Sequence, residues 1–168
     1  IAKAATFNFA NYYRAAYGLK VCTGILYNHE SYRRTEAYLS RKVTKAVANI
    51  KRGKQTELKL GDLEGFVDWG YAPEFMDIVI ELLEGQHFQD YVIGTGKLTK
   101  VKDFVEMAFS HVGLKWNQYV SYDQNLERPI KTSSLCANTD KLRQHLGRVP
   151  EIGISDLIAN MVSYDLEN

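Results

Sequence analysis

The residues best suited to chemistry form a run of cations between positions 33 and 54. Eight lysines or arginines lie there against a single acid, Glu36, whereas residues 57–90 carry nine acids against one lysine. Arg33 and Arg34 stand in a predicted loop just before a predicted helix, where guanidinium groups and free N–H groups can converge on a phosphate. Dense like charges also form an ordinary solvated helix face. The charge pattern alone therefore leaves open both an anion site and a solvated face.

Other kinds of catalytic or metal site find no support in the sequence. The four histidines lack the mutual spacing of metal ligands, and neither Cys22 nor Cys136 has a ligand partner nearby, so we expect no metal site. The sequence contains no Gly-x-Ser-x-Gly turn for a nucleophilic serine and no Gly-x-Gly-x-x-Gly or Walker loop for phosphates. The two distant cysteines are expected to be buried, reduced thiols of a cytoplasmic protein.

Length and composition bound the class of protein. A chain of 168 residues with 45% hydrophobic and 24% charged residues predicts one globular domain with its own core. The net charge of +1 argues against a basic nucleic-acid binder, and no apolar run approaches the roughly 20 residues of a membrane span. The chain begins Ile-Ala-Lys without a visible signal peptide, and such a start indicates a piece of a longer protein.

Helices and strands are predicted to alternate along the chain, which is typical of an α/β fold. Apolar residues at helical spacing and flanking glycines predict helices over residues 1–17, 39–50, 71–84, 101–112, 139–146 and 155–166. Short runs of branched or alternating apolar residues predict strands over residues 19–27, 57–60, 91–94 and 116–122. Loops are predicted over residues 28–36 and 61–70, and no linker divides the chain.

Several of these elements carry expectations about burial and capping. The first helix is apolar around much of its circumference, so we expect it to be buried and to end at Gly18. The strand over residues 19–27 is mostly apolar and is predicted to be interior. Thr99 and Ser155 are predicted to cap the N-termini of the fourth and sixth helices.

Two neighbouring motifs in the first third of the chain are specific enough to suggest a family. Residues 24–34 read Gly-Ile-Leu-Tyr-Asn-His-Glu-Ser-Tyr-Arg-Arg, and residues 39–46 read Leu-Ser-Arg-Lys-Val-Thr-Lys-Ala. This combination closely resembles the GDP-mannose 4,6-dehydratases, a family of extended short-chain dehydrogenases/reductases. Further motifs follow in the family's order: Leu-Gly-Asp-Leu at 60–63, Asp-Trp-Gly-Tyr-Ala at 68–72, Asp-Tyr-Val-Ile-Gly-Thr-Gly at 90–96, Phe-Val-Glu-Met-Ala at 104–108 and Arg-Pro at 128–129.

The resemblance covers essentially the whole chain but only the second half of such an enzyme. It implies that residues 1–168 are the C-terminal portion of a nucleotide-sugar dehydratase, in which the end of a Rossmann-like domain interleaves with a smaller sugar-nucleotide domain. The N-terminal cofactor-binding half would lie upstream, with the family's Gly-rich loop, its catalytic Thr or Ser and Glu, and its catalytic tyrosine. Lys3 would be the lysine of the family's Tyr-x-x-x-Lys pair. The chain by itself is therefore expected to be inactive.

The resemblance also implies an activity and a set of site residues. The family converts GDP-mannose to its 4-keto-6-deoxy derivative with NADP, which takes a hydride from C4 and returns it to C6 after water has left. A homo-oligomer, tetramer or dimer, is expected, because the Arg-Arg loop of the family reaches a neighbouring subunit's cofactor. The residues assigned to NADP are Lys3, His29 and Arg34, and those assigned to the sugar nucleotide are Asn28, Leu39, Lys42 and Arg128, with Lys3 also catalytic.

Two substitutions depart from the family pattern. Val67 stands where the family carries an arginine, and Lys131 stands where it carries a glutamate. Because both positions belong to the nucleotide side, we expect weaker recognition of the diphosphate and of guanine. The alternatives are a related nucleotide-sugar epimerase or reductase, and a non-catalytic nucleotide-sugar-binding or assembly module.

Overall fold

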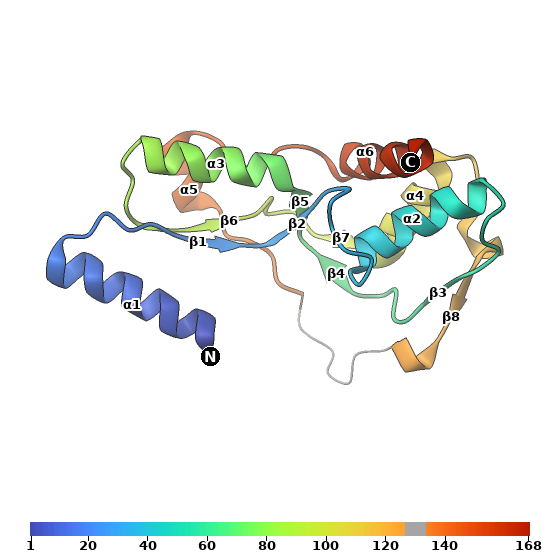
Figure 1. Ribbon diagram of the computed structural model, residues 1–168, viewed down its shortest axis with the longest axis horizontal. Coiled ribbons are helices and arrows are strands. Elements are labelled where there is room, and N and C mark those ends of the chain that lie inside the picture. The colour runs from blue at the N-terminus through green and yellow to red at the C-terminus, as the bar shows by residue number, and fades with distance from the viewer. Residues whose placement is uncertain (127–133) are drawn as a thin grey trace.

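The computed structural model describes residues 1–126 and 134–168 (Figure 1). Its elements alternate between helix and strand, which confirms the α/β class. In chain order they are α1 (Ala2–Tyr17), β1 (Thr23–Leu26), β2 (Asn28–Glu30), α2 (Leu39–Lys51), β3 (Leu58–Leu60), β4 (Phe66–Val67), β5 (Trp69–Tyr71), α3 (Ala72–Glu84), β6 (Asp90–Ile93), β7 (Thr99–Lys100), α4 (Val101–His111), the 3₁₀ helix η1 (Trp116–Gln118), β8 (Val120–Tyr122), the 3₁₀ helix η2 (Gln124–Leu126), α5 (Asp140–Leu146) and α6 (Ile154–Glu167).

Within the described residues the strands pair as four two-stranded ladders. The pairs β1–β6, β2–β5 and β3–β8 are parallel, whereas β4 and β7 are antiparallel. Parallel neighbours cannot be joined by a tight turn, so each parallel pair is separated in sequence by at least one helix. The carboxyl ends of β1 and β6 consequently lie side by side, where the Tyr27 amide donates to the Ile93 carbonyl at 2.9 Å.

Two hydrophobic cores hold these elements together. The larger core packs α2, α4 and α6 against one another and includes Val43, Val47, Phe104, Phe109, Leu157 and Met161. The smaller core packs α3 and α5 against β6 and includes Phe75, Ile78, Leu82, Tyr91, Ile93 and Leu142. Since α3 and β6 lie between α2 and α4 in the sequence, the chain passes back and forth between the two cores.

The helices of the larger core lie close to their predicted positions, but their predicted caps are wrong. The apolar faces predicted for α4 and α6 are buried. Thr99 pairs with Val67 in the β4–β7 ladder, which leaves Lys100 at the N-cap position of α4. Gly153 occupies the N-cap position of α6, and the Ser155 hydroxyl lies 3.6 Å from the Met107 sulfur instead. Strand pairing and side-chain packing thus decide where these two helices begin.

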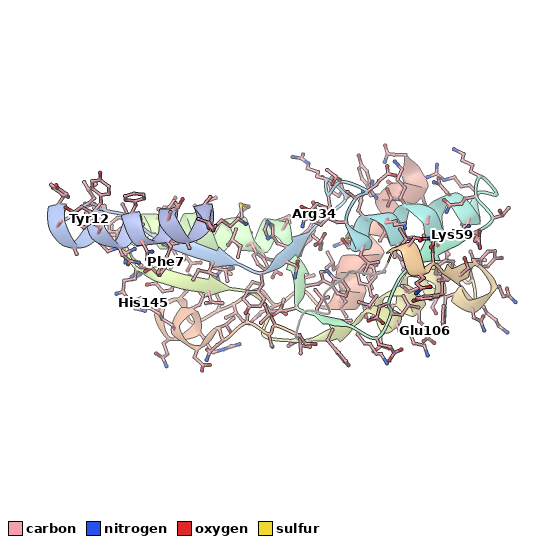
Figure 2. The ribbon with its side chains drawn as sticks, turned by 90° about the horizontal axis from the view of Figure 1, so that it is seen from below. Phe7, Tyr12, Arg34, Lys59, Glu106 and His145 are labelled. Carbon is pink, nitrogen blue, oxygen red and sulfur yellow. The ribbon has the colours of Figure 1, made fainter. Side chains whose placement is uncertain are left out.

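The first helix, α1, ends where predicted but is not buried. Gly18 follows it with a φ of 62°, the left-handed geometry that stops a helix. No residue of α1 is buried, and Tyr12 and Tyr17 are 56% and 64% exposed. Figure 2 shows Tyr12 on α1, pointing away from the other elements. The helix is held by Arg14, whose guanidinium donates to the Asp90 carboxylate at 2.6 Å. Its apolar face finds no covering surface among the described residues because α1 diverges from both cores (Figure 1).

The strand predicted over residues 19–27 is shorter than expected and not interior. Ile25 and Leu26 are 44% and 38% exposed, and neither belongs to the two hydrophobic cores. Among the described residues β1 pairs with β6 alone. The predicted loops contain β2, β4 and β5, whose two or three residues carry too little pattern to be recognised. The segment predicted as a strand from residue 116 starts with η1, and Cys136 is exposed rather than buried.

One buried carboxylate connects segments that are far apart in the sequence. Asp68, between β4 and β5, is fully buried. Its oxygens accept hydrogen bonds from the Thr95 amide and hydroxyl at 3.0 and 2.5 Å, from the Gly96 amide at 3.0 Å and from the Ala137 amide at 3.1 Å. Asp68 thereby fixes both the turn after β6 and the segment leading to α5.

We expect Asp68→Asn to destabilise the chain by about 3 kcal/mol, because a neutral amide replaces an ionised acceptor and turns its N–H₂ group toward other donors. Urea unfolding followed by circular dichroism measures this change. Asp77→Asn, on the exposed face of α3, is the matched control and should change the free energy of unfolding little. Equal stability of the two variants would contradict this role of Asp68.

Candidate functional site

Five of the residues assigned by resemblance lie on one continuous unit, β2, the following loop and the start of α2. Asn28 is exposed and His29 is half-buried on β2, which is held in parallel register with β5. His29 Nδ1 lies 2.8 Å from the Tyr27 carbonyl oxygen, and the His29 ring lies 5.3 Å from the ring of Phe75. These contacts fix the orientation of the imidazole and leave Nε2 without a hydrogen bond inside the described chain.

The loop after β2 is organised by Glu30, whose side chain is 2% exposed. Glu30 Oε2 accepts a hydrogen bond of 2.6 Å from the Ser40 hydroxyl, in the first turn of α2. The same oxygen lies 3.4 Å from Arg34 Nε, within ion-pair distance. One carboxylate therefore draws the arginine of the loop and the beginning of the helix together.

Arg34 is held from a second side by an aromatic ring. Its guanidinium carbon lies 3.5 Å from the centroid of the Tyr38 ring, a close cation–π contact. Figure 2 shows Arg34 in the turn between β2 and α2. The Nε atom is buried without a hydrogen bond, and the terminal guanidinium nitrogens make none within the described residues. The guanidinium is thus positioned but retains donors for a ligand.

The buried setting changes the acidity of Glu30. Burial raises the pKa of its carboxyl above the usual value, and the Ser40 hydrogen bond and the charges of Arg34 and His29 lower it again only in part. The neighbouring cations thus offset only part of the free-energy cost of burying this carboxylate.

The start of α2 carries the other two assigned residues. Leu39 is the first residue of the helix and is half-buried, while Lys42 donates from Nζ to the Lys59 carbonyl at 2.7 Å. A buried ion pair between Arg41 and Asp165 ties the same helical turn to α6. Lys42 is therefore placed beside β3 by a helix that cannot readily shift.

A cavity of about 390 Å³ lies between the end of β3 and β8. Its lining includes Leu60, Leu63, Trp116, Tyr122 and the carboxylate-bearing side chains Asp62 and Glu64. Aromatic and aliphatic walls with a few polar groups are typical of pockets for small organic ligands, which begin at about 300 Å³. Lys59, whose carbonyl holds Lys42, directly precedes Leu60 in this wall.

The remaining assigned residues are not brought into this unit. Lys3 is exposed in the first turn of α1, and no hydrogen bond or ion pair among the described residues joins it to β2 or α2. Arg128 and Lys131 lie outside the described residues. Val67 is half-buried in β4.

In the described part of the chain no cluster of three or more His, Cys, Asp or Glu side chains is suited to a metal ion.

Sequence reasoning missed the side chains that build this unit. Glu30 and Ser40 belong to the two motifs that carry the resemblance, yet neither was singled out. Glu30 ends a strand and Ser40 lies in a helix, so no single period relates them and only folding shows that they touch. An acid and a hydroxyl within two otherwise basic and aromatic motifs was the available signal.

Glu30 should make stability depend on pH. The folded chain holds the Glu30 proton more tightly than the unfolded chain, so the free energy of unfolding should decrease as the pH rises from the usual glutamate range through the raised pKa. Glu30→Gln removes this dependence, which urea unfolding at a series of pH values detects as the difference from wild type. Glu36→Gln, in the same loop but 61% exposed, is the control. A difference that stays constant with pH would refute this account of Glu30.

Comparison with known proteins places the chain in a family. The GDP-mannose 4,6 dehydratase family profile matches residues 1–161. GDP-mannose 4,6 dehydratase 2 of Arabidopsis thaliana is 41% identical over 155 residues, covering 92% of this chain and 42% of the relative. The GDP-mannose 4,6-dehydratase of Yersinia enterocolitica is 33% identical over 182 residues, covering 92% and 49%. The chain thus spans somewhat less than half the length of these relatives.

Solved structures with lower sequence identity share the fold. The structure of RMD from Pseudomonas aeruginosa complexed with NADPH matches with a TM-score of 0.84 at 17% identity, over 95% of this chain and 52% of that one. A UDP-N-acetylglucosamine 4-epimerase from Methanobrevibacter ruminantium matches with a TM-score of 0.82 at 19% identity, over 98% and 52%. At such identities the likeness concerns the fold alone. The match of the family profile to nearly the whole chain shows that this chain belongs to the GDP-mannose 4,6-dehydratase family.

Proposed function

We propose that this chain is the C-terminal portion of a GDP-mannose 4,6-dehydratase, which converts a nucleotide hexose to its 4-keto-6-deoxy derivative with NADP. The observation that carries the proposal is the unit from β2 to α2. There the family motif holds His29, Arg34 and Lys42 on a single frame organised by Glu30. Residues 1–168 then combine the end of the Rossmann-like domain with the sugar-nucleotide domain, and the N-terminal cofactor-binding half is a separate stretch of the enzyme.

Exposed apolar side chains on α1 and β1 support the proposal that an N-terminal half of the enzyme packs against them. Phe9 and Tyr12 on α1 are 62% and 56% exposed, and Ile25 on β1 is 44% exposed. β1 also has one free edge among the described residues. Apolar faces of this kind normally bury against a neighbouring layer of the same domain. A complementary N-terminal half would provide that layer and extend the parallel sheet beyond β1.

The substrate is assigned by the chemistry of the β3–β8 cavity and of Lys42. The aromatic and aliphatic lining suits the flat face of a nucleotide base, and the Asp62 and Glu64 carboxylates can accept its N–H donors. The Lys42 ammonium lies beside the cavity wall and can pair with a diphosphate. GDP-mannose is therefore the favoured substrate. We expect weaker binding of its diphosphate because Val67 supplies no charge, and weaker selection of guanine because Lys131 cannot accept the guanine N–H donors.

The cofactor assignment rests on Arg34, His29 and Lys3. The guanidinium donors of Arg34 that find no acceptor in the described chain fit a phosphate of NADP, and the oriented His29 ring offers Nε2. Lys3 would bind the nicotinamide ribose once α1 is covered. When bound, NADP accepts and returns a hydride, and the residues of this chain bind and orient the NADP. Assembly into a tetramer or dimer would bring the Arg33–Arg34 turn to a neighbouring subunit.

A related nucleotide-sugar epimerase is the second candidate, because the fold likeness to such an enzyme extends over 98% of this chain. The product distinguishes the two activities. A 4-keto-6-deoxy sugar, lighter than the substrate by one water, indicates the dehydratase, whereas an isomer of the same mass with an inverted hydroxyl indicates the epimerase.

The chain supplied with its N-terminal half should convert GDP-mannose to the 4-keto-6-deoxy product, while the chain alone with NADP should form none. Both preparations are compared with a buffer control by mass spectrometry of the products. Product formation by the chain alone, or its absence from the combined protein, would disprove the assignment. Binding of GDP-mannose without turnover would instead indicate a non-catalytic binding module.

Arg34→Ala in the combined protein should weaken NADP binding by about 1–3 kcal/mol, the usual effect of losing a charge-assisted hydrogen bond. Isothermal titration calorimetry measures the affinity, and Lys51→Ala on the exposed end of α2 is the control. NADP affinity that is equal in the two variants would count against a cofactor role of Arg34.

A further inference from the structure

We propose a second anion site, for a phosphate-bearing small molecule, in the cavity at the carboxyl end of β6. This cavity has a volume of about 460 Å³ and lies between the turn 95–97 and the residues around the start of α5. None of its lining residues is among those assigned to NADP or to the sugar nucleotide. The proposal does not rest on the dehydratase activity.

The charge of the cavity favours an anion. Lys97 and Arg143 line it from opposite segments, and neither side chain has an ion-pair or hydrogen-bond partner among the described residues. Asp140 contributes one carboxylate to the same lining, so the cations are in excess. A phosphate group presents enough oxygens to accept from an ammonium, a guanidinium and a hydroxyl together, whereas a carboxylate offers two oxygens.

A threonine hydroxyl in the same lining makes no hydrogen bond within the described chain. Thr139 is 9% exposed and stands at the N-cap position of α5, yet its side chain makes no capping hydrogen bond and no other within the described chain. Its Oγ1 faces Gly96, 3.6 Å from where a Cβ at Gly96 would stand. Thr139 is therefore available to a ligand oxygen.

The walls of the cavity are held rigid and open. The Asp68 carboxylate accepts hydrogen bonds from the amides of Thr95, Gly96 and Ala137. The two segments that line the cavity, the turn 95–97 and the stretch before α5, are therefore held by the same buried acceptor. Gly96 adopts a φ of +70°, and a Cβ there would approach the Ala137 carbonyl oxygen to 3.4 Å. A side chain at this position would thus narrow the space between Lys97 and Thr139. A preorganised frame lowers the ordering cost of binding.

Pyrophosphate is the probe, titrated into the full chain by calorimetry and by amide chemical shifts. We expect binding with shifts centred on Gly96 and Thr139. Lys97→Gln and Arg143→Gln should each weaken it by roughly ten-fold, the equivalent of about 1.4 kcal/mol for a charge-assisted hydrogen bond. Thr139→Val, which removes the hydroxyl and keeps the side-chain shape, should also weaken binding. Lys54→Gln, an exposed cation elsewhere, is the matched control and should not.

Three results would overturn the proposal. One is pyrophosphate affinity that is unchanged in both Lys97→Gln and Arg143→Gln. Another is loss of binding in Arg34→Gln together with normal binding in Lys97→Gln, because the anion would then occupy the β2–α2 unit. The last is binding of citrate without pyrophosphate, which would exclude phosphate as the recognised group. Circular dichroism of each variant checks that the fold is retained. Because binding is measured on the chain itself, failure of dehydratase activity leaves this test unaffected.

Discussion

The Asp68 carboxylate is the interaction on which the arrangement of the chain most depends. It is fully buried and accepts from two segments that are distant in sequence, the turn after β6 with Thr95 and Gly96 and the stretch leading to α5 with Ala137. A buried ionised group is tolerated when donors surround it, and here every donor but the Thr95 hydroxyl is a backbone amide. The same bonds orient the β6 end of the smaller core and shape the walls of the polar cavity beside it.

Two further buried polar contacts position the β2–α2 unit that forms the candidate site. Glu30 draws Ser40 and Arg34 together, and the Arg41–Asp165 pair fastens the same helix to α6. Between them these contacts determine where α2 starts and how it is oriented, and so where Lys42 and Arg34 lie. The two contacts also explain why a short loop can hold an arginine in position without a metal or a disulfide in the described chain. Side chains supported in this way would need little reorganisation to bind a ligand.

The local features of the site followed from the sequence, and its supporting contacts did not. The Arg33–Arg34 turn before a helix was recognisable from charge and spacing, and the family motif made His29 and Lys42 candidate binding residues. Glu30 remained unnoticed because a lone acid in a loop is usually solvated. Asp68 also escaped notice, since its donors lie 27 to 69 residues away. Hydrogen bonds between distant segments leave no periodic trace in the sequence.

The sequence by itself determined the α/β class, the family and the positions of the longer helices. Regular apolar spacing records which face of a helix is buried, so α4 and α6 were predicted with their inner faces. The tertiary structure decided the short strands, the helix caps and the exposure of α1. Strands of two or three residues exist through their partners, and Thr99 follows its pairing with Val67 rather than its capping preference. Whether an apolar helix is buried depends on whether another part of the fold packs against it, and the sequence of α1 alone does not show this.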